Sequence, residues 1–135
     1  SVAAVTAIPR LSSTVTEVGS VQGGVGRYQA DGEDDYLIAP VPLPDGATVT
    51  GFSYTLFDSS ANADSEAFLY RSDDEPMASV KSAGSEPTVR SLSTEQVRLR
   101  KVEATRFSYF VYFQVSTSAR ANLMPISASI SYTTK

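Results

Sequence analysis

Two groups of oxygen-bearing side chains have a spacing that could hold a metal ion. They are Asp58, Asn62, Asp64 and Glu66 in one group, and Asp31, Glu33 and Asp35 in the other. Calcium takes several oxygen ligands, but neither group has the glycine and glutamate that an EF-hand loop needs at its sixth and twelfth positions. Because ordinary Asx turns account for both groups, we expect no metal ion or other cofactor to be required.

Catalytic chemistry is restricted because the chain has no histidine and no cysteine. These absences exclude a Ser–His–Asp triad, a thiolate nucleophile and a zinc–thiolate site. A glycosidase needs only two carboxylates, so a carboxylate-only hydrolase remains an alternative. The acids of residues 31–35 and 73–75 lie in turn-like, solvated segments, and we therefore expect that the chain is not an enzyme.

Aromatic side chains are the remaining candidates for ligand binding. The tyrosines are Tyr28, Tyr36, Tyr54, Tyr70, Tyr109, Tyr112 and Tyr132. They could form a platform on which sugar rings stack, although core packing with the hydroxyl group at the rim explains most of them. The absence of tryptophan weakens the interpretation as a glycan-binding module.

Charge argues against nucleic acid as a partner, since the net charge is −4 and the basic cluster Arg98, Arg100 and Lys101 is typical of a solvated strand face. No segment approaches the roughly 20 apolar residues that cross a bilayer, so we expect no transmembrane segment. The opening Ser1-Val-Ala-Ala is compatible with a mature N-terminus after removal of a leader. We therefore expect an extracellular or cell-surface location.

The elements that position these residues are predicted to be strands. Residues 48–58 alternate after a turn at Pro44-Asp45-Gly46, and residues 126–133 alternate strictly. Residues 106–115 are bulky on both faces, as in a central strand. Further strands are expected at 66–71, 77–80, 88–93 and 97–102. Short strands separated by turns predict an all-β fold, a single antiparallel β-sandwich or jelly-roll-like domain with an extended N-terminal arm.

The alternation also predicts a core. The side chains expected to be buried are Phe52, Tyr54, Leu56, Leu69, Val111, Ile126, Ile130 and Tyr132.

From about residue 35 onward the layout resembles a diffuse group of uncharacterised secreted bacterial β-sandwich domains. The matching pieces are Leu43-Pro-Asp-Gly-Ala47, the strand ending at Asp58, Leu69-Tyr-Arg71, the Tyr-rich strand at 109–112 and the terminal 126–133. The resemblance implies a β-sandwich and an extracellular setting, and it carries no catalytic residues. Ser59 and Glu103-Ala104 depart from the pattern of that group.

The first 26 residues differ from the rest of the chain and predict a division into an N-terminal β-prone arm or edge strands (1–26) and a β-sandwich domain (27–135). The arm could complete its own sandwich or pair with a neighbouring subunit. We expect the second, which makes the protein a self-assembling structural subunit of a fibre, appendage or surface layer. The residues predicted to contact another subunit are Val2, Val5, Ile8, Val15 and Val18. The alternative function is a secreted ligand-binding module, with a glycan as the ligand.

Overall fold

The computed structural model describes residues 2–11, 13–21, 24–32, 35–61, 63–86, 88–116 and 118–134. Within these ranges the regular structure is β-strand, apart from two short 3₁₀ turns, η1 (Ala4–Thr6) and η2 (Arg120–Asn122). The strands are β1 (Val2–Ala3), β2 (Ile8–Pro9), β3 (Val15–Val21), β4 (Gly24–Asp31), β5 (Asp35–Pro40), β6 (Thr48–Asp58), β7 (Glu66–Arg71), β8 (Glu75–Lys81), β9 (Val89–Thr94), β10 (Tyr109–Val115) and β11 (Leu123–Thr133).

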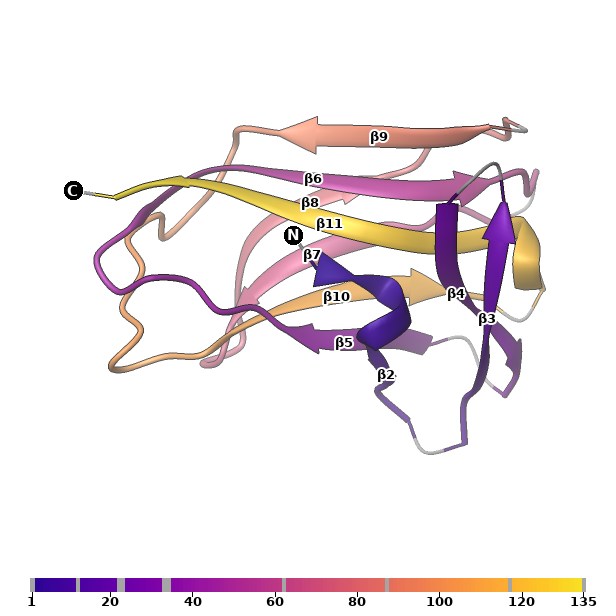
Figure 1. The fold of residues 1–135 in the computed structure, drawn as a ribbon, viewed down its shortest axis with the longest axis horizontal. Helices are drawn as coiled ribbons and strands as arrows, with labels where there is room; N and C mark the ends of the chain where they lie inside the picture. The colour runs from indigo at the N-terminus through magenta and orange to yellow at the C-terminus, as the bar shows by residue number, and fades with distance from the viewer. Residues whose placement is uncertain are drawn as a thin grey trace.

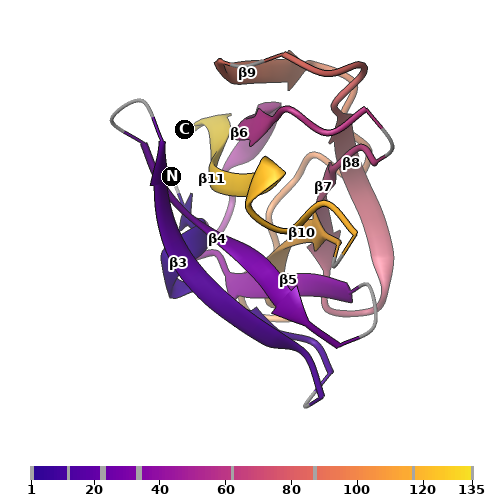
Figure 2. The ribbon, with the colours of Figure 1, turned by 90° about the vertical axis from the view of Figure 1, so that its right-hand side faces the viewer.

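Two antiparallel sheets pack against each other and form a β-sandwich, which confirms the predicted fold class. Sheet A has the strand order β1-β11-β6-β9, and sheet B has the order β2-β5-β10-β7-β8. Figure 1 shows the two sheets from the side, and Figure 2 shows them from one end. The strands β3 and β4 form a separate hairpin.

The core lies between the long central strands that the alternation predicted. Tyr54 and Leu56 of β6 and Val111 and Phe113 of β10 are fully buried, and the rings of Tyr54 and Phe113 lie 5.8 Å apart. Burial of each such side chain contributes roughly 1.5–3 kcal/mol relative to leaving it in water. As predicted, β10 is the middle strand of its sheet.

The prediction for β11 was wrong in part, because the register of this strand shifts against β6 at two places, near Ile126 and near Tyr132. The first shift makes Ile126 an extra residue of β11, and the second makes Thr50 an extra residue of β6. Ile126 is partly exposed, Ile130 is partly buried against the core, and Tyr132 is 43% exposed. Ala128, on the face that the alternation predicted to be buried, is buried, and so are Leu123 and Met124 at the start of the strand.

The N-terminal segment bridges the two sheets of its own chain. The strand β1 pairs with β11 of sheet A, and β2 pairs with β5 of sheet B. Between them Ala4 and Ala7 are buried in the core cluster, together with Val2. The strands of residues 2–9 therefore close one side of the sandwich, which was the alternative to pairing with another subunit.

The hairpin β3–β4 lies across β11 in Figure 1. The backbone of β4 approaches β11 so closely that a Cβ atom on Gly26 would lie 2.2 Å from the carbonyl oxygen of Pro125. Only glycine permits this contact. Ile126 packs here, since a Cβ atom on Gly24 would lie 2.9 Å from its Cδ1 atom.

Two loops lie at the end of the sandwich opposite the hairpin β3–β4 (Figure 1). Residues of the second loop line a surface described below. The predicted turn is present, with Ala47 N donating to Pro44 O (3.1 Å) and Gly46 at a φ of 84°. The prediction of a strand at 97–102 was wrong, because this segment is irregular apart from one β-bridge between Lys101 and Thr48. It connects the sheets, as Arg98 N donates to Met77 O and Val49 N donates to Arg100 O.

The outer face of sheet A carries hydroxyl groups in rows across three strands. Cross-strand neighbours give one row of Ser127, Thr55 and Ser91 and a second row of Ser129, Ser53 and Ser93. The hydroxyl oxygens of Thr55 and Ser91 are 2.7 Å apart. These two rows are polar, whereas the next row of the same face, Met124, Phe57 and Val89, is apolar and begins where the hairpin β3–β4 crosses β11.

Candidate functional site

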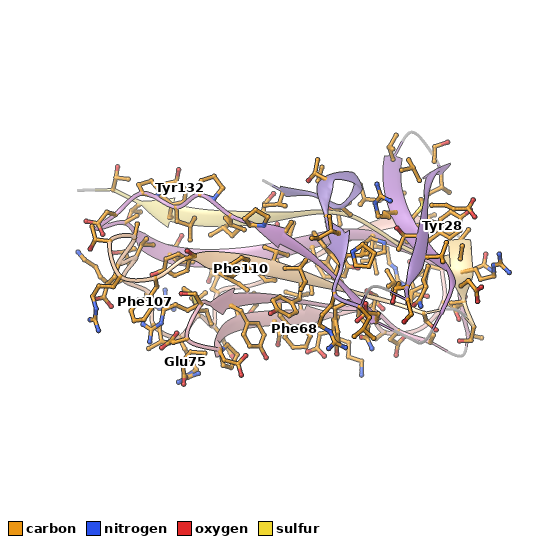
Figure 3. The ribbon with its side chains drawn as sticks, turned by 90° about the horizontal axis from the view of Figure 1, so that it is seen from below. Tyr28, Phe68, Glu75, Phe107, Phe110 and Tyr132 are labelled. Atoms are coloured by element: carbon orange, nitrogen blue, oxygen red, sulfur yellow. The ribbon has the colours of Figure 1, made fainter. Side chains whose placement is uncertain are left out.

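The outer face of sheet B carries aromatic rings on its three inner strands. These residues, called here the aromatic face, are Tyr36 of β5, Phe110 and Tyr112 of β10, and Phe68 and Tyr70 of β7. Each is partly exposed, while the residues between them point into the core. The register sets Tyr112 opposite Phe68 and Phe110 opposite Tyr70. Figure 3 labels Phe68 and Phe110, which lie along the middle of the molecule between Phe107 and Tyr28.

Most of these rings contact one another. The ring centroids of Tyr70 and Tyr112 lie 5.0 Å apart, and those of Phe68 and Tyr70 lie 5.8 Å apart. Tyr36 lies 6.0 Å from Phe68 and 6.2 Å from Tyr112, edge to face in both cases. Such pairs restrict ring motion and are worth about 0.5–1.5 kcal/mol beyond area burial. The rings therefore form a pre-arranged surface.

A hollow of about 320 Å³ lies over this surface and is called here the aromatic hollow. Its lining consists of Tyr36, Phe68, Tyr70, Tyr112, Arg10 and Asp74. The hollow thus combines apolar ring faces with phenol groups, one guanidinium group and one carboxylate.

Arg10 is fixed beside the aromatic hollow by Asp35, whose carboxylate is fully buried. The Arg10 Nε and Asp35 Oδ1 atoms are 3.1 Å apart, and the guanidinium carbon lies 5.8 Å from the Tyr36 ring centroid. Burial alone raises the pKa of the Asp35 carboxyl group. Hydrogen bonds from the backbone of Leu11 and Tyr36 and from the Thr14 hydroxyl, with the charge of Arg10, outweigh burial and leave the pKa lowered. Asp35 is therefore an anion that holds Arg10 in place.

The Tyr70 phenol is neutral at ordinary pH. Burial raises its pKa, and the nearby negative charge of Asp74 and the neighbouring Tyr112, Tyr36 and Glu66 raise it further. A neutral phenol both donates and accepts hydrogen bonds. It can therefore pair with a sugar hydroxyl in either sense.

The candidate calcium groups do not assemble in the described residues. Asp58 is buried, and its carboxylate accepts hydrogen bonds from Ser60 N and the Ser82 hydroxyl, with Arg90 3.7 Å away. Asp31 accepts from Gly32 N, and Asp35 is paired with Arg10. Asn62 and Glu33 lie outside the described residues. Over the described ranges, no three acidic residues form a group that could hold a metal ion.

The residues predicted to contact another subunit all lie within the first 18 residues. Val2 is buried in its own chain, whereas Ile8, Val15 and Val18 are 66%, 50% and 55% exposed. The backbone of Val5 lies in η1, and its side chain is not among the described ones. Contact of the exposed residues with another copy stays a prediction.

Sequence reasoning named three of the five aromatic-face residues among the tyrosines but missed Phe68 and Phe110. The sequence did contain a signal, since residues two positions apart in a strand lie on the same face. Phe68 therefore lies on the same face as Tyr70, and Phe110 on the same face as Tyr112. Which strands are neighbours could not be derived from that pattern. Core packing was predicted for most of the seven tyrosines, and this was wrong: only Tyr54 and Tyr109 are buried in the core.

A scan of protein-family models finds no match to this chain. No curated protein matches it either. Among the described residues, no helix is long and apolar enough to cross a membrane.

Several solved structures share the fold over nearly the whole chain. A family 6 carbohydrate-binding module, studied by sub-site dissection with crystallography and calorimetry, aligns with a TM-score of 0.60 and 13% identity over 99% of this chain and 92% of that one. The CBM36-1 domain of a multidomain xylanase from the hindgut metagenome of Trinervitermes trinervoides aligns with a TM-score of 0.54 and 13% identity, covering 96% and 94% of the two chains. The carbohydrate-binding module CBM36 in complex with calcium and xylotriose aligns with a TM-score of 0.52 and 16% identity, covering 98% of each chain. At these identities the likeness establishes the β-sandwich fold.

Proposed function

We propose that this domain is a non-catalytic glycan-binding module and that its aromatic face is the binding surface. The observation that carries the proposal is the set of contacting, partly exposed rings on three neighbouring strands. The carbohydrate-binding modules that share the fold support this function over the self-assembling subunit expected from the sequence. The pairing of the N-terminal strands within their own chain supports it as well.

Binding follows from the two kinds of group that line the aromatic hollow. The C–H face of a pyranose ring is apolar and packs on an aromatic ring, with Tyr112 and Phe68 offering neighbouring faces. Sugar hydroxyls then pair with the Tyr70 phenol, the Asp74 carboxylate and the Arg10 guanidinium group at the rim. The ring contacts hold the surface in place before the ligand arrives, which lowers the entropic cost of binding.

We propose a non-enzymatic function because hydrolysis of a glycosidic bond uses two carboxyl groups, one on each side of the scissile bond. Asp74 is the single carboxylate in the lining of the aromatic hollow among the described residues. A glycan-binding domain of this kind would act outside the cell, in agreement with the expected location.

Affinity electrophoresis in gels containing soluble xylan, mixed-linkage glucan or polygalacturonate tests the proposal, with calorimetry for the polymer that retards the protein. Tyr112→Ala and Tyr70→Ala should each weaken binding by about 30-fold, since a central aromatic contact is worth roughly 2 kcal/mol or more. Tyr132→Ala is the matched control because Tyr132 is an exposed tyrosine outside the aromatic face (Figure 3). Equal binding by all three variants, or no retardation by any polymer, would contradict the proposal.

A further inference from the structure

A second hollow, of about 440 Å³, adjoins the aromatic face at Phe68, which lines both hollows. We call it the arginine hollow. Its floor is apolar, with Met77 and Ala78 of β8 and Val97 all buried. Its remaining walls include Arg98 and Arg100. No acidic side chain is in this lining among the described residues.

The strand register connects the two hollows into one path across sheet B. Tyr112 lies opposite Phe68, and Phe68 lies opposite Ser79 of the edge strand β8. Ser79 is exposed and lines the arginine hollow. Neighbouring strands are about 4.8 Å apart, so the step from Tyr112 to Ser79 is about 10 Å. A polymer that crosses the strands at this row passes from the stacked rings to Ser79, which lines the same hollow as the two arginines.

The two arginines of this hollow are held in place but retain the capacity to bind an anion. Arg100 donates to the backbone carbonyl oxygens of Glu95 (2.8 Å) and Val49 (3.4 Å) and has no carboxylate partner among the described residues. Arg98 donates to Pro76 O and lies 3.6 Å from Glu75, in a pair with side chains 61% and 45% exposed. Such an exposed ion pair contributes little, so a ligand can replace it at small cost. The planar fork of arginine matches a carboxylate with two parallel hydrogen bonds.

The aromatic hollow is a poorer place for an anion. Arg10 is already paired with the buried Asp35, and Asp74 places a negative charge in the same lining. A carboxylate there would face repulsion without an unpaired cation. The charge distribution therefore separates the path into a neutral stacking part and a cationic part.

We infer that the ligand is an acidic polysaccharide, whose neutral ring faces stack on the aromatic face while Arg98 and Arg100 bind the carboxylate of a uronic acid residue in the arginine hollow. This inference rests on the proposed function, because it names the class of glycan for the same surface. It also assigns a role to the basic cluster that sequence reasoning interpreted as a solvated strand face.

The test compares binding of polygalacturonate oligosaccharides with binding of the same oligosaccharides after chemical reduction of their carboxyl groups, by calorimetry on the intact chain. The acidic form should bind at least tenfold more tightly, and binding should weaken between about 50 and 200 mM salt. Arg98→Gln and Arg100→Gln should each remove about tenfold from binding of the acidic form and leave binding of the reduced form unchanged. A sulfated polysaccharide of similar charge distinguishes a carboxylate site from a general anion site.

Arg120→Gln is the charge-matched control, since Arg120 is exposed in η2, at the other end of the sandwich from the turn at Gly46 (Figure 1). Arg100 also donates hydrogen bonds to two backbone carbonyl oxygens, so its replacement could destabilise the fold. Melting temperatures of all variants separate a loss of stability from a loss of binding. Equal binding of acidic and reduced forms, equal loss in Arg120→Gln, or tighter binding of the sulfated polymer would each overturn the inference. In the first case Tyr112→Ala would still weaken binding by about 30-fold, so the proposed function would stand. Absence of binding to every polymer would overturn both.

Discussion

At the scale of single residues, Asp35 links stability to the candidate site. Its buried carboxylate accepts hydrogen bonds from Leu11 N and the Thr14 hydroxyl and pairs with Arg10. These partners lie on the chain between β2 and β3, so one side chain ties that connection to β5. Arg10 then projects toward the aromatic hollow.

We predict that Asp35→Asn lowers the free energy of unfolding at pH 7 and makes this free energy less dependent on pH in the acid range. The folded-state pKa of Asp35 is below its unfolded value of 3.8. The contribution of the Asp35 carboxylate to the free energy of unfolding is therefore complete above the unfolded-state pKa. It is lost as the pH falls through the folded-state pKa. The wild-type and Asp35→Asn curves should converge in acid, as measured by urea denaturation from about pH 7 to about pH 2. The exposed Asp31→Asn serves as control, and a constant offset between the wild-type and Asp35→Asn curves at every pH would contradict the prediction.

At the scale of elements, predictability depended on whether a strand keeps one register. The strand β10 and residues 52–58 of β6 were predicted well because their large side chains alternate and one sheet face is buried. The alternation fails at the start of β6, where Val49 is buried as well as Phe52. In β11 the sequence also alternates, but Ile126 is an extra residue in the register and is only partly buried. An alternating sequence does not reveal a bulge, since the extra residue is set by the neighbouring strand and by the hairpin that crosses it.

The hairpin β3–β4 supplies a test of that crossing. We predict that Gly26→Ala destabilises the fold by about 1–3 kcal/mol, as overpacking does, because its Cβ atom would lie 2.2 Å from Pro125 O and backbone would have to move. The comparison variant is Gly51→Ala, where the nearest atom to the new Cβ, Thr94 O, is 3.4 Å away. Thermal unfolding of both variants measures the difference. An unchanged melting temperature for Gly26→Ala would show that the hairpin does not depend on this close contact.

At the scale of the whole molecule, the N-terminal strands are part of the sandwich. Val2, Ala4 and Ala7 lie in the core, and β1 and β2 each add an edge strand to a different sheet. The sequence could not distinguish this arrangement from pairing between subunits, since exposed backbone groups and apolar side chains are satisfied equally well by either partner.

Deletion of residues 1–10 is therefore expected to unfold the domain or lower its melting temperature strongly. The loss has two sources, the buried side chains and the newly exposed edges of β5 and β11. Circular dichroism measures the folded fraction, and size-exclusion chromatography with light scattering measures the mass of both chains. A truncated chain that stays folded and changes from oligomer to monomer would instead support the contact between subunits through Ile8, Val15 and Val18.

The hydroxyl rows on sheet A and the rings on sheet B make the middle parts of the two outer faces of the sandwich different in polarity. The serine and threonine rows are well hydrated, so moving them from water onto a polysaccharide gives no favourable free energy from apolar burial. Only the side with the rings gains by adsorbing. A module bound in this way lies on a polysaccharide with one side down, and its remaining freedom is to turn or slide within that plane.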